Sequence, residues 1–324
     1  MEDLPDPETP VKTTNLFLGN SKETFLRLFS LAPLTMILSS TIFYYSRKVS
    51  VCLRVLNIAF DLIYNQIMKI TILGAGTFFV SAKKSGPSYL LEADGKKILI
   101  DCGPGTLLRL SELSLKPEDL DYIFISHFHA DHMSDLFPLQ MSFRINDFYA
   151  KGKKSKTPII FGPEGIDEFT KKLSYIYELP AFDNYSKIKY KKYQESIQLG
   201  NLSVKTFKVN HVSFNVTAKA YALRFETDGK VVAFSGDSNK CKGLIDVCKK
   251  ADLFICDTSY SKGNGNMAHL DSFEVGEIAQ RSNVKKLVLT HIYPRAESAD
   301  LEAEVREKYF GEIIKGEDFM EFEI

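Results

Sequence analysis

Three of the chain's six histidines lie within the seven residues SHFHADH, Ser126 to His132. The segment directly follows the apolar run YIFI, which is typical of a buried β-strand. His127 and His129 are two residues apart, so their side chains project to the same side of an extended segment. Asp131 and the last histidine follow where the chain turns into a helix. Imidazoles and a carboxylate this crowded have little reason to pack together. They predict a site for Zn²⁺ or a similar divalent cation at a strand end.

The other three histidines and one aspartate also lie beside strand-like runs or turns. His211 follows LSVKTFKVN, His291 follows KLVLT, and Asp237 lies just after VVAFS, while His269 lies in the polar turn GNGNMAHLD. If these strand ends meet at one edge of a sheet, the side chains converge. A carboxylate can bridge two cations, and we assign this role to Asp237. For any single histidine of this kind, an ordinary core or surface residue is the open alternative.

Short apolar runs alternate with helical patterns from Met68 onward. Strand-like runs cover 69–73, 88–93, 97–101, 122–126, 158–161, 202–209, 220–226, 231–235, 253–256 and 286–290. Helical patterns cover 105–114, 131–143, 164–177, 240–250, 271–282 and 300–309. Asp271, with Glu274 three residues later, predicts a capped helix start. The mixture predicts a layered α/β domain over residues 68–324.

Residues 1–67 differ from the rest and are predicted to form a separate helical, apolar N-terminal extension. Residues 28–46 carry no charge, and this uncharged run is just long enough to cross a bilayer. Pro33 and several Ser and Thr residues weaken the prediction of a membrane-spanning helix. The polar residues of 51–67 follow one narrow helical stripe, which predicts an interfacial or packed amphipathic helix. We expect membrane contact only if residues 28–67 are a real part of the native protein. The alternative is a native start at Met68, with 1–67 not part of the protein.

The overall composition is that of a globular protein without a general charge bias. Basic and acidic residues balance at 41 each, which argues against a nucleic-acid coat protein. The five cysteines are odd in number and show no CxxC pair, so we expect buried thiols in a reducing compartment rather than disulfides or zinc ligands. The expected location is therefore cytoplasmic, with a membrane tether as the alternative.

Two basic clusters are candidates for contact with single-stranded nucleic acid, because they combine positive charge with nearby aromatic residues. They are Lys151, Lys153, Lys154 and Lys156 in KGKKSK, and Lys187, Lys189, Lys191 and Lys192 around Tyr190 and Tyr193. The alternative is a solvated loop and a solvated strand face.

Taken together, these motifs resemble the metallo-β-lactamase fold of two-metal hydrolases. The resemblance covers 68–324 and rests on SHFHADH, GD at 236–237 and TH at 290–291, with LGAGT (73–77), ILIDCGPGT (98–106) and LTHIYPR (289–295) in the expected order. It implies a four-layer αββα sandwich with two metal ions at one edge, Zn²⁺ first, with Mn²⁺ or Fe²⁺ as alternatives.

The resemblance also implies a role for individual residues. The first metal would be held by His127, His129 and His211, the second by Asp131, His132 and His291, with Asp237 bridging them. Asp101 falls where the family has a carboxylate that orients a ligand histidine.

Within the fold, AHLDSFEVGEIA resembles ribonuclease Z and related phosphodiesterases, which carry a histidine at the place of His269. Asp257 matches the acidic partner of that histidine, where the branch more commonly has Glu. Asp237 instead of Cys disfavours β-lactam hydrolysis, and His129 instead of Glu disfavours flavin-linked reduction. Members that mature tRNA 3′ ends often insert a Gly/Pro-rich arm between the residues matching His211 and Asp237, and no such arm fits this chain. Dimers are common in this branch, so a homodimer is a further expectation.

The mechanism implied is attack on phosphorus by a hydroxide that two cations share, with Asp131 orienting the water or taking its proton. His269, held by Asp257, would protonate the leaving oxygen. The favoured prediction is a phosphodiesterase or endoribonuclease of ribonuclease Z type, with a phosphodiester substrate that could be RNA. A metal-dependent hydrolase of thioesters or other carbonyl compounds is the alternative. A non-catalytic metal-stabilised module is a third hypothesis, which the full ligand set disfavours.

Overall fold

The structure is a computed structural model that describes residues 67–149, 156–178 and 188–324. Residues 1–66 of the predicted N-terminal extension lie outside the described residues, as do Lys151, Lys153, Lys154 and Lys187 of the basic clusters. In the described ranges, no helix is both long enough and apolar enough to cross a bilayer.

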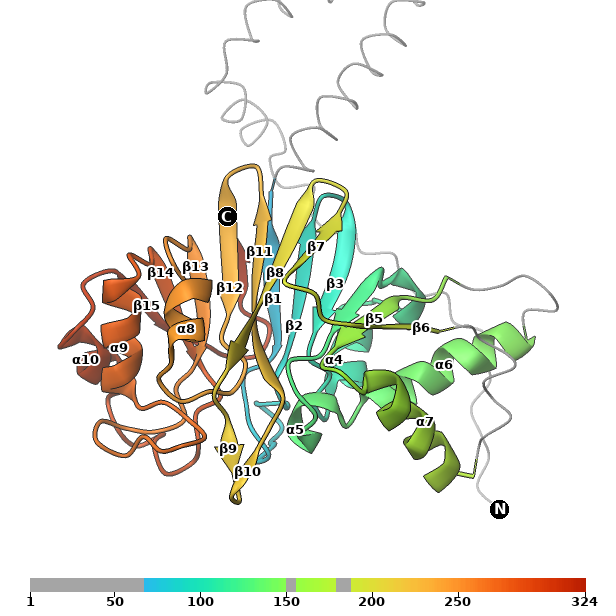
Figure 1. The fold of residues 1–324 in the computed structure, drawn as a ribbon, viewed down its shortest axis with the longest axis horizontal. Helices are drawn as coiled ribbons and strands as arrows, with labels where there is room; N and C mark the ends of the chain where they lie inside the picture. The colour runs from blue at the N-terminus through green and yellow to red at the C-terminus, as the bar shows by residue number, and fades with distance from the viewer. Residues whose placement is uncertain (1–66, 150–155, 179–187) are drawn as a thin grey trace, which may run out of the picture. The chain divides into compact units, whose positions relative to one another are not determined.

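Two seven-stranded mixed sheets form the centre of the described domain (Figure 1). The first sheet has the order β16 (Glu321–Glu323), β1 (Lys69–Gly74), β2 (Ser88–Ala93), β3 (Lys96–Ile100), β4 (Tyr122–Phe124), β5 (Ile159–Gly162) and β6 (Lys189–Lys192). The second has the order β15 (Glu312–Lys315), β14 (Lys286–Thr290), β13 (Leu253–Asp257), β12 (Lys230–Phe234), β11 (Ala220–Thr227), β8 (Leu202–Val209) and β7 (Ser196–Leu199). A small ribbon of β9 (Val212–Ser213) and β10 (Val216–Thr217) projects beyond the second sheet.

Helices lie on the outer side of each sheet, which gives the predicted α/β sandwich (Figure 1). Those beside the first sheet are α4 (Thr106–Glu112), the short 3₁₀ turn η1 (Pro117–Asp119), α5 (Ala130–Met133), α6 (Leu136–Tyr149) and α7 (Ile166–Ile176). Those beside the second are α8 (Lys242–Val247), α9 (Ser272–Arg281) and α10 (Leu301–Arg306). The predicted cap of α9 is confirmed, because the Asp271 carboxylate accepts a hydrogen bond from the Glu274 backbone N–H at 2.9 Å.

The apolar strands pack on both faces, which explains why their sequences are continuously apolar. In β13, Leu253 and Ile255 belong to the core between the sheets, whereas Phe254 and Cys256 belong to the core under the helices. Side chains alternate in this way because successive residues of a strand point to opposite faces.

The predicted helix 131–143 is two helices, which is a correction. The chain bends at Asp135, whose carboxylate accepts hydrogen bonds from the backbone N–H groups of Gly105 and Leu107. Its own N–H donates to the carbonyl of Cys102. Pro138 lies in the first turn of α6, where a missing N–H is tolerated, so a new helix starts there.

The site is positioned by strands that end at the same edge. Strands β3 and β4 run parallel, as do β12, β13 and β14. Asp101 directly follows β3, and His127 comes shortly after β4. Asp237 comes shortly after β12, Asp257 ends β13, and His291 follows β14. Parallel strands therefore place carboxylates and imidazoles from both halves of the chain at one edge.

Candidate metal centre

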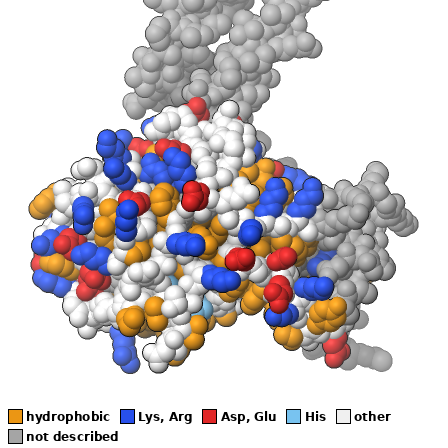
Figure 2. Space-filling view, viewed as in Figure 1, with side chains coloured by type: hydrophobic (Ala, Val, Ile, Leu, Met, Phe, Trp, Pro, Cys, Tyr) orange, Lys and Arg blue, Asp and Glu red, His pale blue; other side chains and the backbone are white. Residues whose placement is uncertain are grey.

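The SHFHADH segment leaves β4 as a buried loop and enters α5 at Ala130. His127, Asp131 and His132 are each at most 2% exposed, while His129 is partly exposed. Little histidine surface is visible on the face in Figure 2, which agrees with this burial.

A first group of possible ligands consists of His127, His129, His211 and Asp237. Their ligand atoms all lie within 4.8 Å of one another. His211 Nε2 lies 3.0 Å from His129 Nδ1, and His127 Nε2 lies 3.7 Å from an Asp237 oxygen. His211 Nδ1 donates to the Ala268 carbonyl at 2.8 Å, so its Nε2 faces the group without a proton.

A second group consists of Asp131, His132, Asp237 and His291, again within 4.8 Å. His132 Nε2 lies 3.1 Å from Asp237 Oδ1, and His291 Nε2 lies 3.3 Å from Asp131 Oδ2 and 3.5 Å from Asp237 Oδ2. Asp237 belongs to both groups. The geometry thus brings together all seven residues that the sequence predicted as ligands, in the predicted two sets.

Asp101 supports the site from the first sheet. Its carboxylate accepts hydrogen bonds from the Ser126 N–H at 2.7 Å and the Ser126 hydroxyl at 2.9 Å. It also accepts from His132 Nδ1 at 2.8 Å. The Ser126 hydroxyl in turn accepts from His127 Nδ1 at 3.0 Å. These bonds fix both imidazoles with Nε2 directed toward the two groups, as a metal-binding histidine requires.

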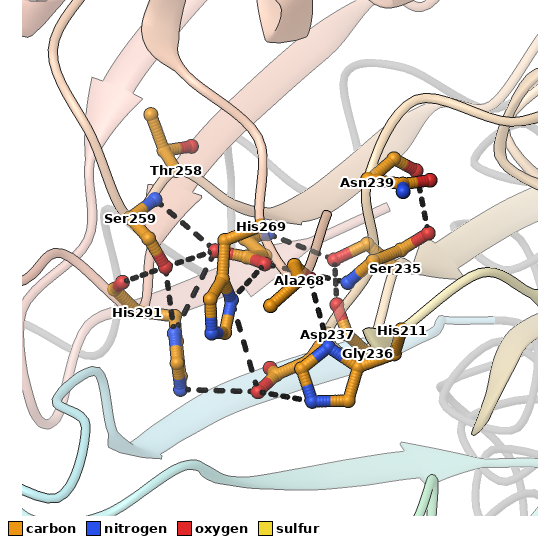
Figure 3. Close-up of polar contacts among 12 residues, drawn as sticks. His211, Ser235, Gly236, Asp237, Asn239, Thr258, Ser259, Ala268, His269 and His291 are labelled. Atoms are coloured by element: carbon orange, nitrogen blue, oxygen red, sulfur yellow. Dashed lines mark hydrogen bonds and ion pairs between the residues drawn. The ribbon is translucent and has the colours of Figure 1, made fainter. Parts of the chain in front are cut away.

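Asp257 supports the site from the second sheet. One carboxylate oxygen accepts from His269 Nδ1 at 2.8 Å. The other accepts from the Ser259 hydroxyl at 2.5 Å, and that hydroxyl lies 3.0 Å from His291 Nδ1; Figure 3 shows Ser259 beside His291. The side chains of Asp257, His269 and His291 also form a third compact group with Asp237. The Asp257 oxygens and His269 Nδ1 are already hydrogen-bonded within the protein, so this third group is less suited than the first two to hold a cation.

The electrostatics divide the histidines into two kinds. Burial, and then repulsion by neighbouring imidazoles, lowers the pKa of His127 well below its usual value. Burial likewise lowers the pKa of His129 and of His211. Burial opposes the charged form of His291 too, but Asp237, Asp131 and Asp257 overcome it and raise its pKa to about 10.

The carboxylates act on the remaining histidines in the same way. Against the effect of burial, Asp237, Asp131 and Asp101 raise the pKa of His132 well above its usual value. Asp257, also against burial, raises the pKa of His269.

The side chains fit divalent cations. Three buried atoms of the two groups have no hydrogen-bond partner among the described residues: His127 Nε2, His132 Nε2 and Asp131 Oδ1. Buried polar atoms are normally satisfied, so unpartnered atoms that converge on one place indicate a ligand. Imidazole nitrogens with carboxylate oxygens suit Zn²⁺, and also Mn²⁺ or Fe²⁺.

Comparison with known proteins assigns the family. Residues 68–310 match the family model described as Anti-Pycsar protein Apyc1. The chain belongs to the Apyc1 family.

This Apyc1-family chain is also similar to curated and solved metallo-hydrolases. It is 28% identical over 248 residues to the probable metallo-hydrolase YhfI of Bacillus subtilis, with 76% of this chain and 96% of the relative covered. The crystal structure of YhfI, described as a metallo-β-lactamase fold protein, matches with a TM-score of 0.68 at 25% identity, covering 80% of this chain and all of the other. Ribonuclease Z of Archaeoglobus fulgidus is 25% identical over 314 residues, with 80% and 98% covered.

A more distant match shows the fold alone. Zn²⁺-bound PqqB of Methylobacterium extorquens has a TM-score of 0.58 at 15% identity, with 79% of this chain and all of that chain covered. The Apyc1-family chain is therefore an α/β protein of the metallo-β-lactamase fold and a metal-dependent hydrolase of that superfamily. Its His/Asp cluster is consistent with a binuclear metal site.

Three features of this Apyc1-family site were not predicted. Ser126 and Ser259 link a carboxylate to a histidine. The sequence offered a local signal for each of these serines: Ser126 is the first residue of SHFHADH, and Ser259 lies in ICDTSY, two residues after Asp257. The third feature is a set of aromatic rings for which the sequence holds no pattern: Tyr293 lies beside His269 and His291, Tyr260 lies beside His269, and Phe79 contacts Tyr293.

Proposed function

We propose that the protein is a metal-dependent phosphodiesterase that acts on small nucleotide phosphodiesters, cyclic nucleotides foremost. The observation that carries this proposal is the Asp257–His269 pair beside Asp237. Hydrolysis of an alkyl phosphodiester needs a proton donor for a poor leaving oxygen, in addition to the cations that activate water. A pair of carboxylate and imidazole next to a full ligand set supplies that donor.

The proposed ligands are the two groups of the candidate centre, with Asp237 shared. Cations bound there would act as Lewis acids on the phosphate and lower the pKa of a water molecule. Asp131 Oδ1 is buried without a hydrogen-bond partner in the described structure, so it can orient this water or accept its proton. His269 keeps Nδ1 bonded to Asp257, and that carboxylate favours the protonated imidazole because it raises the pKa of His269 against the effect of burial. Its other nitrogen can then protonate the leaving oxygen.

The family supports a small substrate, since Apyc1-family proteins are cyclic nucleotide phosphodiesterases. The connection from His211 to Asp237 supports it as well. The strands β9, β10, β11 and β12 account for most of these residues, and they leave no length for a tRNA-binding arm. An endoribonuclease of ribonuclease Z type is the second candidate, because the curated relatives include several proteins of that name.

The test is a parallel assay of purified, metal-quantified protein on cyclic nucleotides, pre-tRNA, bis(p-nitrophenyl) phosphate and a thioester. We expect cyclic nucleotides to be hydrolysed most efficiently. His269→Ala should lower kcat for them by about 10²- to 10⁴-fold, the usual contribution of a general acid. The same variant should lose much less activity on bis(p-nitrophenyl) phosphate, because p-nitrophenolate leaves without a proton.

That activated substrate is the internal control, since all six histidines of the chain lie in the site. Thioester turnover that His269→Ala leaves unchanged, with no turnover of any phosphodiester, would instead establish the carbonyl hydrolase. Cleavage of pre-tRNA alone would select the endoribonuclease.

A further inference from the structure

Aromatic rings extend from the candidate metal centre toward solvent. Tyr293 lies two residues after His291, and its ring centroid is 5.6 Å from that imidazole and 5.5 Å from the imidazole of His269. Tyr260 stacks on Tyr293 at 5.5 Å with an interplanar angle of 14°. Phe79 meets Tyr293 edge to face at 5.9 Å. We call Phe79, Tyr260 and Tyr293 the aromatic wall.

The outer end of the aromatic wall is exposed although it belongs to a restrained loop. Phe79 is 61% exposed, and its neighbours Phe78 and Val80 are more than half exposed. At the base of this loop, the Asp318 carboxylate accepts hydrogen bonds from the N–H groups of both Ala75 and Ser85 at 2.9 and 2.8 Å.

Further contacts hold the loop in place. The Gly76 N–H donates to the Ser85 carbonyl, which closes the base. Arg109 pairs with Asp318 at 3.0 Å, and Lys84 pairs with Glu297 at 2.5 Å. An apolar ring held on a pinned loop beside a polar cation site does not serve the core, because most of its surface faces water. Its position suits a ligand that brings its own flat apolar face.

We propose that the aromatic wall binds the planar base of the substrate by stacking, with the exposed ring of Phe79 as its outer contact. The inference rests on the proposed phosphodiesterase function and adds the residues that would recognise the base of the nucleotide, which sugar and lipid phosphodiesters lack. In this binding mode, one nucleotide places its phosphate at the cations and its base against the aromatic wall.

The chemistry of the wall also predicts broad base tolerance. Apart from two tyrosine hydroxyls, its side chains offer no group that reads hydrogen-bonding edges. Stacking tolerates every base, because each has a π face. Purine and pyrimidine nucleotides should therefore be accepted alike, within the modest differences of stacking strength.

The experiment compares substrates with and without a base. Wild type, Phe79→Ala, Phe79→Trp and the control Phe310→Ala are assayed on 3′,5′-cyclic AMP, 3′,5′-cyclic CMP and the base-free methyl riboside 3′,5′-cyclic phosphate. Phe310 is a matched control because it is 75% exposed and precedes β15, whose first residue pairs with the start of β14, at the opposite end from His291.

Phe79→Ala should raise KM for both cyclic nucleotides by about 5- to 100-fold, the range of base–aromatic stacking, and leave kcat within about twofold. It should leave the base-free substrate unaffected. Phe79→Trp should restore KM, and Phe310→Ala should match wild type on all three. Equal loss on the base-free substrate, or no loss on any, would overturn the inference. Equal melting temperatures check that the variants fold.

A binding measurement separates this inference from the proposed function. Calorimetry with metal-loaded protein compares AMP with ribose 5-phosphate, which requires no turnover. If Phe79→Ala weakens the binding of AMP but not that of ribose 5-phosphate, the aromatic wall binds bases even in a protein that hydrolyses no phosphodiester. If cyclic nucleotides are hydrolysed but Phe79→Ala binds AMP as tightly as wild type, the phosphodiesterase stands and the stacking inference fails.

Discussion

The two sheets support the candidate metal centre with the same chemical arrangement, built in different ways. In the first sheet, Asp101 accepts from His132 directly and reaches His127 through the Ser126 hydroxyl. All of these residues except Asp101 lie within one heptapeptide. Local sequence alone therefore brings the imidazoles of this half together.

In the second sheet, Asp257 accepts from His269 directly and reaches His291 through the Ser259 hydroxyl. Asp257 ends β13, Ser259 and His269 lie in the one connection between β13 and α9, and His291 follows β14. The imidazoles of this half converge only because parallel strands end at one edge. The difference teaches that similar support for a cation site can come from local sequence or from topology, and the following experiments test how alike the halves are.

The largest effect is expected where the halves meet, at Asp237. Asp237→Ala removes a carboxylate from both ligand groups, so we expect loss of both metals and a fall in turnover of more than about a thousandfold. His129→Ala alters the first group alone and should leave about one metal per chain. Metal analysis and turnover of bis(p-nitrophenyl) phosphate measure both. Asp246→Ala, at an exposed position of α8, is the control. Two metals retained by Asp237→Ala would contradict the shared role.

A smaller effect should distinguish the two supporting carboxylates. Asp101→Asn weakens a direct bond to His132 and an indirect one to His127, so we expect metal affinity to fall about 10- to 100-fold. Asp257→Asn should weaken metal binding less, because Asp257 reaches the ligand His291 only through Ser259, but it should lower kcat through His269. Chelator competition measures affinity. Equal losses of affinity in both variants would mean that the carboxylates have the same role.

A last difference concerns the pH dependence of metal binding by the two ligand groups. Carboxylates raise the pKa of His132 and of His291, the latter to about 10, so the metal-free second group holds protons at neutral pH that a cation must displace. Its affinity should therefore rise with pH, by about tenfold per unit for each proton released, until the pKa is passed.

The first group should behave differently. Burial lowers the pKa of His127, His129 and His211, so these imidazoles are already neutral and its affinity should change little near neutral pH. Metal titrations from about pH 6 to pH 8 compare His129→Ala, which retains the second group, with His291→Ala, which retains the first. A steeper slope in His291→Ala would contradict the assignment.

A structural feature could be predicted from the sequence when the residues that form it lie close together along the chain. The long apolar strands and SHFHADH are patterns within one segment, so both were predicted. The edge strands β6, β7, β15 and β16 were not, because they have only three or four residues and lie at the edges of the two sheets. Ser259 lies 32 residues from His291 along the chain, and Phe79 lies more than 200 from Tyr293. Tertiary packing determines which of these distant residues come into contact, and the hydrophobic periodicity of the sequence does not reveal such contacts.

The return of the C-terminus to the first sheet has a consequence for biosynthesis. β16 pairs with β1 although β15, which precedes it in the chain, belongs to the second sheet, so residues 321–323 complete a sheet that begins with β1 among the described residues. During synthesis, this edge of β1 stays unpaired until residues 321–323 have been made and can reach it. A message truncated just before Asp318 would therefore yield a product with that edge bare and the Phe79 loop without its anchor, and we expect quality-control proteases to remove it.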